Sequence, residues 1–401
     1  MSIFSSLSPA PADPILGMTE AFGKDPSPDK VNLGVGVYLD ETGTTPLMAC
    51  VRAAEEDLAA VPRPHGYLPI DGLASYTQAA QELAFGENSP ARLAGRVVTM
   101  QAIAGTGALR VGAGLLALAS PNATVLLSEP SWENHELLFS RTGFSTSRYR
   151  YYDPATRSID ADAMIEDLWQ AEPGSIVLIH ACCHNPTGYD LADADWPRVI
   201  EAAQSRGLVP FIDMAYQGLS RGLEKDRYAV ELFAESGIPF VVATSFSKTF
   251  GLYGERVGAI HFVAADADQA AIVLSQAKTV VRSIYSNPPT HGAAIVSSVL
   301  TTPELRALWE DELGQMRNRI KQMRAAFRTG LERAGVTQDL SYITSQAGMF
   351  SYSGLNLAQM RQLREQFHVY GLDSGRLCIA ALNSKNLDHV IEAVATVMKS
   401  S

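Results

Sequence analysis

Short apolar runs alternate with longer amphipathic stretches along the central part of the chain. The amphipathic stretches place apolar residues at helical spacing, and they include Ala108–Ala119, Trp196–Arg206 and Tyr228–Glu235. This alternation predicts an α/β architecture in which helices cover a mostly parallel sheet. The runs with strand character are Val97–Gln101, Thr124–Ser128, Ser145–Tyr151, Ile176–His180, Leu208–Ile212, Phe240–Ser245 and Val257–Phe262.

The pattern changes towards the C-terminus. A single long, charged helix is expected from Pro303 to Ala334, and it would end at Gly335, a residue suited to a C-cap. Two short strands, Met349–Tyr352 and Arg376–Ala380, and a final helix, Leu387–Met398, are expected beyond it. These elements predict a smaller α+β domain, which the long helix joins rigidly to the larger part.

The composition favours a folded protein with a large core. The chain has 401 residues, of which 46% are hydrophobic and 19% charged, a balance that excludes a disordered protein. The formal net charge of -11 argues against a protein that binds nucleic acid or an anionic membrane. No apolar stretch is long enough to span a membrane. The expected partners are therefore small molecules, and an anionic substrate would need a local arginine site.

The cysteines indicate a reducing compartment. The four cysteines are too few for a disulfide framework, and the adjacent pair Cys182 and Cys183 lacks the spaced partners of a zinc site, so no metal is expected. The N-terminal segment MSIFSSLSPAPADP has no basic region followed by an apolar run. We therefore expect reduced thiols, no signal peptide and a cytoplasmic location.

Unusual polar residues lie at the ends of the expected strands, where open α/β sheets bind their ligands. Alone, Asn185 suits a turn before a proline, and Asp213 could cap a helix. Packing gives a poor explanation for Lys248, which stands among hydroxyl groups. Together, the polar residues at these strand ends indicate a ligand site. The residues that define it are Asn185, Asp213, Tyr216, Lys248 and Arg256.

The sequence around these residues resembles the aspartate and aromatic amino acid aminotransferases, a family of class I enzymes that use pyridoxal 5′-phosphate (PLP). The motifs HACCHNPTG, DMAYQG and SFSKTFGLYGERVG carry the resemblance, which extends over the chain through NLGVGVYLDETGTTP, AGTGALR, SWENH, RSIYSNPPTHG and RLCIAALN. It implies PLP fold type I. In that fold, a large domain, here residues 46–305, holds a mostly parallel seven-stranded sheet flanked by helices. A smaller α+β domain would combine residues 1–45 and 306–401.

The resemblance assigns roles around PLP, the expected cofactor. Lys248 would form a Schiff base with the PLP aldehyde and then shuttle a proton between the substrate Cα and the cofactor. Asp213 would pair with the pyridine nitrogen and keep it protonated, which makes the ring an electron sink. Tyr216 and Asn185 would donate hydrogen bonds to the phenolic oxygen. Lys248, Asp213 and Tyr216 are thus the expected catalytic residues.

The phosphate group needs backbone amides at a helix start together with hydroxyl groups and a fixed cation. By resemblance, Trp132 would stack on the cofactor ring with His135 behind it, although bare aromatic residues more often belong to a core. His184 would lie farther from the cofactor. The helix start expected at Ala108 follows a Gly-Thr-Gly sequence that alone indicates only a tight turn. The expected phosphate ligands are Gly105, Thr106, Ser245, Ser247, Arg256 and, from a second subunit, Tyr67.

Two arginines are expected to recognise the substrate. Arg376 would bind the α-carboxylate in a bidentate pair. Gly36, Asn185 and Trp132 would border the same group. Arg282 of a second subunit would bind the distal carboxylate of aspartate, glutamate or their oxo acids. Because this arginine and the tyrosine of the phosphate site act across subunits in the family, the resemblance implies a homodimer with shared active sites.

Two positions depart from the family pattern. Leu39 stands where several aspartate-specific relatives carry lysine, and Gly66 stands where asparagine is common, so both changes favour aromatic side chains. Arg282, Thr106 and Asn287 match the aspartate-preferring pattern. We therefore expect transamination between phenylalanine, tyrosine or aspartate and 2-oxoglutarate, by a ping-pong mechanism.

Three alternatives stay open. The enzyme could be strictly specific for aspartate. It could be a PLP lyase or decarboxylase on the same fold, although such an enzyme gains nothing from Arg282 as a clamp for alternating diacids. A non-catalytic regulator on this fold would carry an added DNA-binding module, for which the chain has no room and an unfavourable acidic charge.

Overall fold

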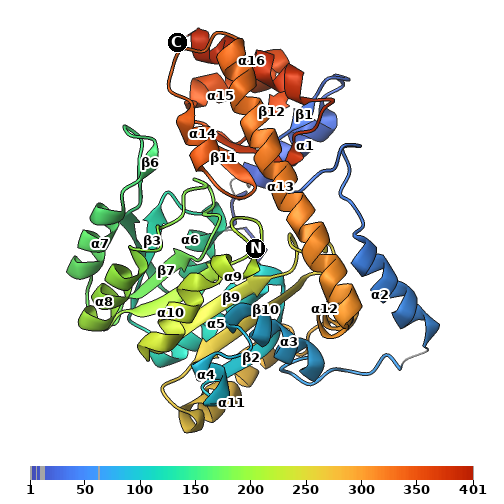
Figure 1. The fold of residues 1–401 in the computed structure, drawn as a ribbon. Coiled ribbons are helices and arrows are strands. Elements are labelled where there is room, and N and C mark those ends of the chain that lie inside the picture. Colours follow the sequence, from blue (N-terminus) through green and yellow to red (C-terminus); the bar gives the residue numbers. More distant parts are fainter. Residues whose placement is uncertain (1, 6, 10–13, 62–63, 401) are drawn as a thin grey trace.

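A seven-stranded sheet forms the centre of the larger part of the molecule (Figure 1). The computed structural model describes residues 2–5, 7–9, 14–61 and 64–400. The strand order is β2-β10-β9-β8-β7-β3-β4, in which β10 is antiparallel to both neighbours and the other pairs are parallel. This confirms the expected α/β fold with a mostly parallel sheet. The strands are β2 Val97–Ile103, β3 Thr124–Glu129, β4 Ser145–Arg150, β7 Ile176–His180, β8 Val209–Met214, β9 Phe240–Ser245 and β10 Val257–Val263.

Helices cover both faces of this sheet, which explains why its strands read as continuous apolar runs. On one face lie α5 Ala104–Ala119, α6 Glu133–Ser140 and α11 Ala267–Ile284; on the other lie α3 Ala74–Phe85, α4 Pro90–Leu93, α7 Ala161–Gln170, α8 Trp196–Arg206 and α10 Tyr228–Ser236. Along β7, Ile176 and Leu178 pack on the first face, whereas Val177 and Ile179 pack on the second. The alternation follows from the two-residue period of a strand.

The smaller part of the molecule gathers at one end of the long helix α13, Pro303–Arg333 (Figure 1). Strand β1, Val31–Asn32, pairs in parallel with β12, Val369–Tyr370, so residues near the N-terminus pack with the C-terminal part. Strand β11, Phe350–Tyr352, is antiparallel to β13, Arg376–Cys378. The domain limits at 45/46 and 305/306 stay predictions. The helices here are α1 Pro14–Lys24, α14 Ser341–Ser345, α15 Leu357–Phe367, the 3-10 turn η1 Ile379–Ala381 and α16 Leu387–Lys399.

Helix α13 contacts both parts of the molecule. Near its start, Trp309 stacks on Phe250 with 4.6 Å between ring centroids and donates a hydrogen bond of 2.8 Å to the carbonyl of Thr249, which follows Lys248. The remaining elements are α2 Ala49–Ala60, α9 Leu223–Asp226, α12 His291–Thr301 and the short strands β5 Tyr152–Asp153 and β6 Ser158–Ile159. Within the ranges described above, no helix is both long and apolar enough to cross a membrane.

Three of the element boundaries that differ from the sequence prediction concern the candidate site or the smaller part. Helix α5 begins at Ala104 instead of Ala108, because Gly105 and Gly107 continue the helix rather than form a turn. Strand β8 extends through Asp213, because its ladder with β7 and β9 continues to the polar end. The last expected strand ends at Cys378, and a 3-10 turn replaces its second half. The first two shifts bring candidate site residues onto regular elements.

Candidate active site

A cavity of about 270 Å³ lies where the carboxyl ends of β7, β8 and β9 meet the first turn of α5. Residues of the smaller part, including Gly36, Phe350 and Arg376, close it from the opposite side. Every site residue predicted from the sequence lines this cavity except Tyr67 and Arg282. The fold therefore brings together groups that the sequence spreads over more than half of the chain.

Lys248 follows the end of β9 and presents its amine inside the cavity. Its Nζ lies 5.1 Å from the centroid of the Tyr216 ring. Burial lowers the pKa of the Lys248 amine to about 8; the Asp213 carboxylate opposes this shift, and the positive charges of Arg256 and Arg376 add to it. A neutral, nucleophilic amine is therefore accessible near neutral pH, unlike that of an ordinary lysine.

Asp213 is held in its ionised form on β8. Its Oδ2 accepts a hydrogen bond of 3.0 Å from Nε2 of His135, whose Nδ1 lies 2.9 Å from the hydroxyl of Ser131. Burial would raise the pKa of Asp213, but the hydrogen bond from His135 and the nearby charge of Lys248 keep it below the ordinary value. A buried carboxylate of this kind suits a protonated nitrogen or another cation as its ligand.

Two further histidines pack beside His135, the hydrogen-bond donor to Asp213. The His180 ring lies 5.3 Å from that of His135 and 4.4 Å from that of His184. His135, His180 and Asp213 have ligand atoms within 4.8 Å of one another, a spacing that a metal ion could bridge. However, His135 already uses both ring nitrogens in hydrogen bonds with Ser131 and Asp213. The cluster therefore suits a polar support for Asp213 better than a metal centre.

The first turn of α5 forms a cradle with hydroxyl groups and a guanidinium. Gly105 lies so close to β9 that an added Cβ would stand 3.3 Å from the Cβ of Ser245. Arg256 contacts the hydroxyl of Ser247 at 3.5 Å and the carbonyl of Tyr253 at 2.9 Å. Both Arg256 and Ala104 have φ near +55°, a strained conformation for residues with a side chain. Unpaired amides, hydroxyls and a cation at a helix start suit a phosphate group.

Arg376 is buried on β13 without an acidic partner. Its Nη1 donates to Oδ1 of Asn185 at 3.0 Å and its Nη2 donates to the carbonyl of Gly34 at 2.7 Å. The guanidinium lies 4.3 Å from the centroid of the Phe350 ring. Among the described residues, its Nε has no hydrogen-bond partner and no carboxylate forms an ion pair with it. A buried cation with a free donor at a cavity suits a carboxylate ligand.

Comparison with known proteins agrees with this geometry. The chain matches the family described as aminotransferase class I and II over residues 28–394. It is 52% identical to an aspartate aminotransferase of Pseudomonas aeruginosa, over 99% of this chain and 100% of that protein. The chain belongs to the class I and II aminotransferase family.

Relatives of this aminotransferase carry two kinds of name. An aromatic-amino-acid aminotransferase of Escherichia coli is 44% identical over 99% of this chain and 100% of that protein. A crystal structure of the aromatic-amino-acid aminotransferase from Burkholderia pseudomallei, covalently bound to pyridoxal phosphate, is 53% identical with a TM-score of 0.97. That comparison covers 99% of this chain and 100% of the crystal structure's chain. The family resemblance is thereby confirmed.

The two predicted residues outside the cavity share one surface of the aminotransferase. The Tyr67 side chain is 96% exposed, and Arg282 lies exposed on α11, where it donates a hydrogen bond to Ser286. Ser286 donates to Oδ1 of Asn287, whose Nδ2 donates to the carbonyl of Leu68 at 2.7 Å. This chain of hydrogen bonds links the segments that carry Tyr67 and Arg282. Their assignment to the site of a second subunit stays a prediction.

Sequence reasoning missed several residues that line the cavity. Val35, Val37, Tyr253 and Phe350 form parts of its wall. The apolar ones gave no signal in the sequence, because a valine in a loop or a phenylalanine in a strand looks like any core residue. His180 was also missed as a site residue, although it ends a buried strand at the carboxyl edge of the sheet, which is a usable signal.

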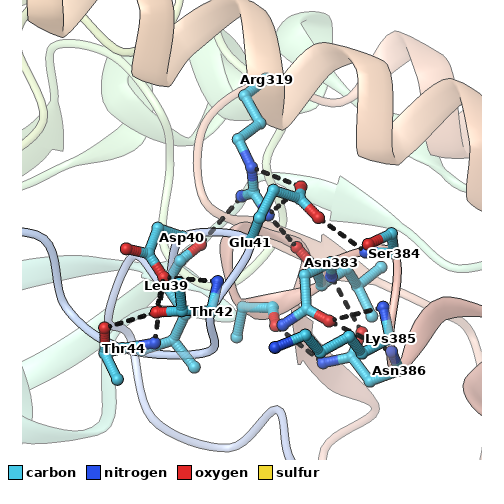
Figure 2. Close-up of polar contacts among 12 residues, drawn as sticks. Leu39, Asp40, Glu41, Thr42, Thr44, Arg319, Asn383, Ser384, Lys385 and Asn386 are labelled. Atoms are coloured by element: carbon cyan, nitrogen blue, oxygen red, sulfur yellow. Dashed lines mark hydrogen bonds and ion pairs between the residues drawn. The ribbon is translucent and has the colours of Figure 1, made fainter.

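The segment that carries Val35 and Val37 is tied down beyond the cavity. Figure 2 shows Arg319 reaching from α13 to three partners. Its guanidinium donates to the Glu41 carboxylate at 2.8 Å, to the Leu39 carbonyl at 2.8 Å and to the Leu382 carbonyl at 2.9 Å. The second Glu41 oxygen accepts from the amide of Ser384 at 3.0 Å. These contacts hold residues 39–41, which closely follow the cavity-lining residues Val35, Gly36 and Val37.

Proposed function

We propose that the protein catalyses PLP-dependent transamination of amino acids. The observation that carries this proposal is the buried Lys248 amine, with a pKa of about 8, placed between the Asp213 carboxylate and the amide cradle of α5. The relatives named above support the reaction class. Transamination also explains Arg376, because every amino acid and oxo acid substrate carries a carboxylate next to the reacting carbon.

The residues present fit the cofactor. The first turn of α5, with Ser245, Ser247 and Arg256, would hold the phosphate. Asp213 would hold the pyridine nitrogen, and Trp132 borders the space for the ring. The free Nε of Arg376 leaves a donor for an anion that is not part of the protein. When bound, PLP supplies an electron-accepting ring that makes the proton on the Cα of an amino acid acidic.

Each residue around the cavity then has its own role in the reaction. Arg376 binds the α-carboxylate and orients the Cα–H bond towards Lys248. The Nζ of Lys248 would accept the proton from the substrate Cα and deliver it to the cofactor. Such a transfer is efficient when the pKa of the base lies near neutral pH, and the pKa of Lys248 is about 8. Asp213 keeps its charge during this step and holds a proton on the ring nitrogen. Tyr216 and Asn185 border the same space and would donate hydrogen bonds to the cofactor oxygen.

The half-reaction tests this proposal directly. The PLP-loaded protein is mixed with aspartate or phenylalanine without an oxo acid, and the cofactor absorbance and the products are recorded. We expect one equivalent of the matching oxo acid per cofactor, with its carbon skeleton intact. Release of carbon dioxide would instead indicate a decarboxylase.

A pair of lysine variants provides the control. Lys248→Ala should slow the half-reaction by roughly a thousandfold or more, because both the nucleophile and the proton carrier are lost. Lys321→Ala removes an exposed lysine of α13, and it should leave the rate unchanged. Full conversion by the Lys248→Ala protein would rule out the proposed mechanism.

We propose that the enzyme accepts both aspartate and aromatic amino acids. Leu39 and Gly66 lower the polarity of the residues that would border a side chain, which favours phenylalanine and tyrosine. Arg282 supports binding of a second carboxylate, and relatives with both names have comparable identity. Strict specificity for aspartate is the alternative, and the relative saturation of the half-reaction by the two donors decides between them.

We further propose a homodimer with shared active sites. The exposed Tyr67 and Arg282, linked through Asn287, support a surface that acts on another copy of the chain. Leu47, Val61 and Ile284 add exposed apolar side chains, 61%, 56% and 41% accessible, that a partner would cover. The four free, buried cysteines support a reducing, cytoplasmic location.

A further inference from the structure

Arg324 is a buried cation that no acidic residue neutralises. It lies on α13, its side chain is 3% exposed, and no described carboxylate forms an ion pair with it. Burial lowers the pKa of Arg324 to about 10, so the guanidinium remains charged at neutral pH. Burying an unpaired charge is costly, and such a group is retained only where hydrogen bonds compensate it.

The compensating acceptors all belong to one short segment, residues 343–350, called here the wall segment. Nη1 donates to the Ile343 carbonyl at 3.0 Å and reaches Oε1 of Gln346 at 3.5 Å. Nη2 donates to the carbonyls of Gly348 and Phe350, both at 2.8 Å. The segment runs from α14 to β11, which lie beside α13 in Figure 1. The rigid planar fork of an arginine holds these three carbonyls in a fixed arrangement, which the flexible ammonium of a lysine would not.

One end of the wall segment supports the loop that carries Asn185. The amide of Ala347 donates to the carbonyl of Gly188 at 2.6 Å, and the amide of Gly188 donates to the carbonyl of His184 at 2.7 Å. The packing is tight, because a Cβ at Gly188 would stand 3.0 Å from the Cβ of Gln346 and from the Phe350 carbonyl oxygen. A shift of the wall segment would therefore shift the Asn185 loop.

The other end supports Arg376. Phe350 and Tyr352 lie in β11, and Tyr352 pairs with Arg376 of β13. The Phe350 ring covers the Arg376 guanidinium at 4.3 Å and leaves no room for a side chain at Gly36, where a Cβ would lie 2.7 Å away. The wall segment thus sets the position of both groups that meet in the Asn185–Arg376 hydrogen bond of 3.0 Å.

We propose that Arg324 is a positioning residue for carboxylate recognition: by clamping residues 343–350 it fixes Arg376 and Asn185 relative to each other. The inference rests on the proposed function, because it assumes that Arg376 binds the substrate carboxylate. It predicts that loss of the arginine fork weakens every carboxylate ligand equally, whatever its side chain. It also predicts a smaller effect on PLP, since Arg324 contacts neither the cradle nor Asp213 and reaches the cofactor only through Asn185.

Arg324→Lys tests the proposal, because it keeps the charge but not the fork. We expect KM for aspartate and for phenylalanine to rise by the same factor, at least about tenfold, while kcat changes less. Binding of succinate and of 3-phenylpropionate to the PLP-loaded protein, measured by calorimetry, should weaken by that factor as well. The PLP dissociation constant should change by a smaller factor, because only Asn185 links Arg324 to the cofactor.

Leu331→Ala is the control for a merely structural effect. Leu331 is buried on the same face of α13, seven residues further along. This variant should lose stability in urea but keep the wild-type KM. An equal rise of KM in both variants, an unchanged KM in Arg324→Lys, or unequal effects on the two donors would each overturn the proposal.

Gly188→Ala keeps the proposal testable if Arg324→Lys does not fold. It displaces the wall segment from the opposite side and should raise KM for both donors by a common factor; an unchanged KM would overturn the proposal. The calorimetric measurement separates this inference from the proposed function. If the wild type converts neither amino acid, the proposed function fails, whereas the effect of Arg324→Lys on carboxylate binding can still be measured.

Discussion

Lys248 and Asp213 face the same cavity, and the pKa of each is lowered for a different reason. Burial disfavours the charged ammonium and brings the pKa of Lys248 to about 8. Burial acts in the opposite sense on Asp213, but the hydrogen bond from His135 outweighs it. The site therefore combines the Lys248 amine, which can lose its proton near neutral pH, with the Asp213 carboxylate, which stays ionised. Proton transfer at an amino acid Cα needs this combination.

Other buried residues give the protein a dependence on pH that is separate from catalysis. Burial lowers the pKa of His180 to about 4 and of His261 to about 3, and it lowers the pKa of His184 well below the ordinary value. Their rings are engaged as neutral groups; His261, for example, lies between the hydroxyls of Thr99 and Thr244 at 2.9 and 3.1 Å. In the unfolded chain these histidines have a pKa near 6.5.

We predict that the protein loses stability between pH 7 and pH 5. In this range the unfolded chain binds protons that the folded protein does not, so the free energy of unfolding falls as the pH falls. From its pKa of about 4, His180 alone contributes a loss of about 2 kcal/mol between these pH values. Urea unfolding at the two pH values measures it. His291→Gln, at a side chain 62% exposed, should show the wild-type pH dependence. Equal stability at pH 7 and 5 would contradict the prediction.

At the scale of elements, Arg319 joins three segments that are distant in sequence (Figure 2). We predict that Arg319→Met lowers the free energy of unfolding by about 1–3 kcal/mol, because the carbonyls of Leu39 and Leu382 lose a charged donor. Glu41→Gln should cost less than about 1 kcal/mol, since the Glu41 side chain is 53% exposed and its ion pair is screened. Urea unfolding of the two variants compares them. Equal losses of unfolding free energy in the two variants would show that the ion pair with Glu41, rather than the hydrogen bonds to the carbonyls, provides the stabilisation.

The elements also show what the sequence can and cannot predict. Asn185, Asp213 and Lys248 were identifiable because polar residues at the ends of apolar strands have few structural explanations. The limits of α5 and β8 were misjudged, because glycines fit a helix as well as a turn and because strand pairing continues through a polar residue. Arg324 could not be found, since it belongs to a charged helix whose arginines look exposed until the fold shows which face is buried.

At the scale of the whole molecule, the described residues that line the cavity include two arginines, Arg376 and Arg256, and the second is the one proposed for the phosphate. Arg376 would serve one carboxylate, while Arg282 lies on the outer surface with Tyr67. A single chain therefore explains the binding of an aromatic amino acid more readily than that of aspartate. A second copy of the chain would supply the missing cation without any change of fold. Arg282→Leu should accordingly reduce turnover of aspartate much more than turnover of phenylalanine.

Mixing two variants that each turn over aspartate poorly tests whether the sites are shared. Lys248→Ala lacks the base but keeps Arg282, and Arg282→Leu lacks the clamp but keeps Lys248. If Arg282 acts across the interface, a mixed dimer contains one site with both residues and one site with neither. Random exchange of subunits then restores about a quarter of the wild-type aspartate activity, because half of the dimers are mixed and each has one complete site. If both residues served the site of their own chain, mixing would restore nothing, since no site would contain Lys248 and Arg282 together.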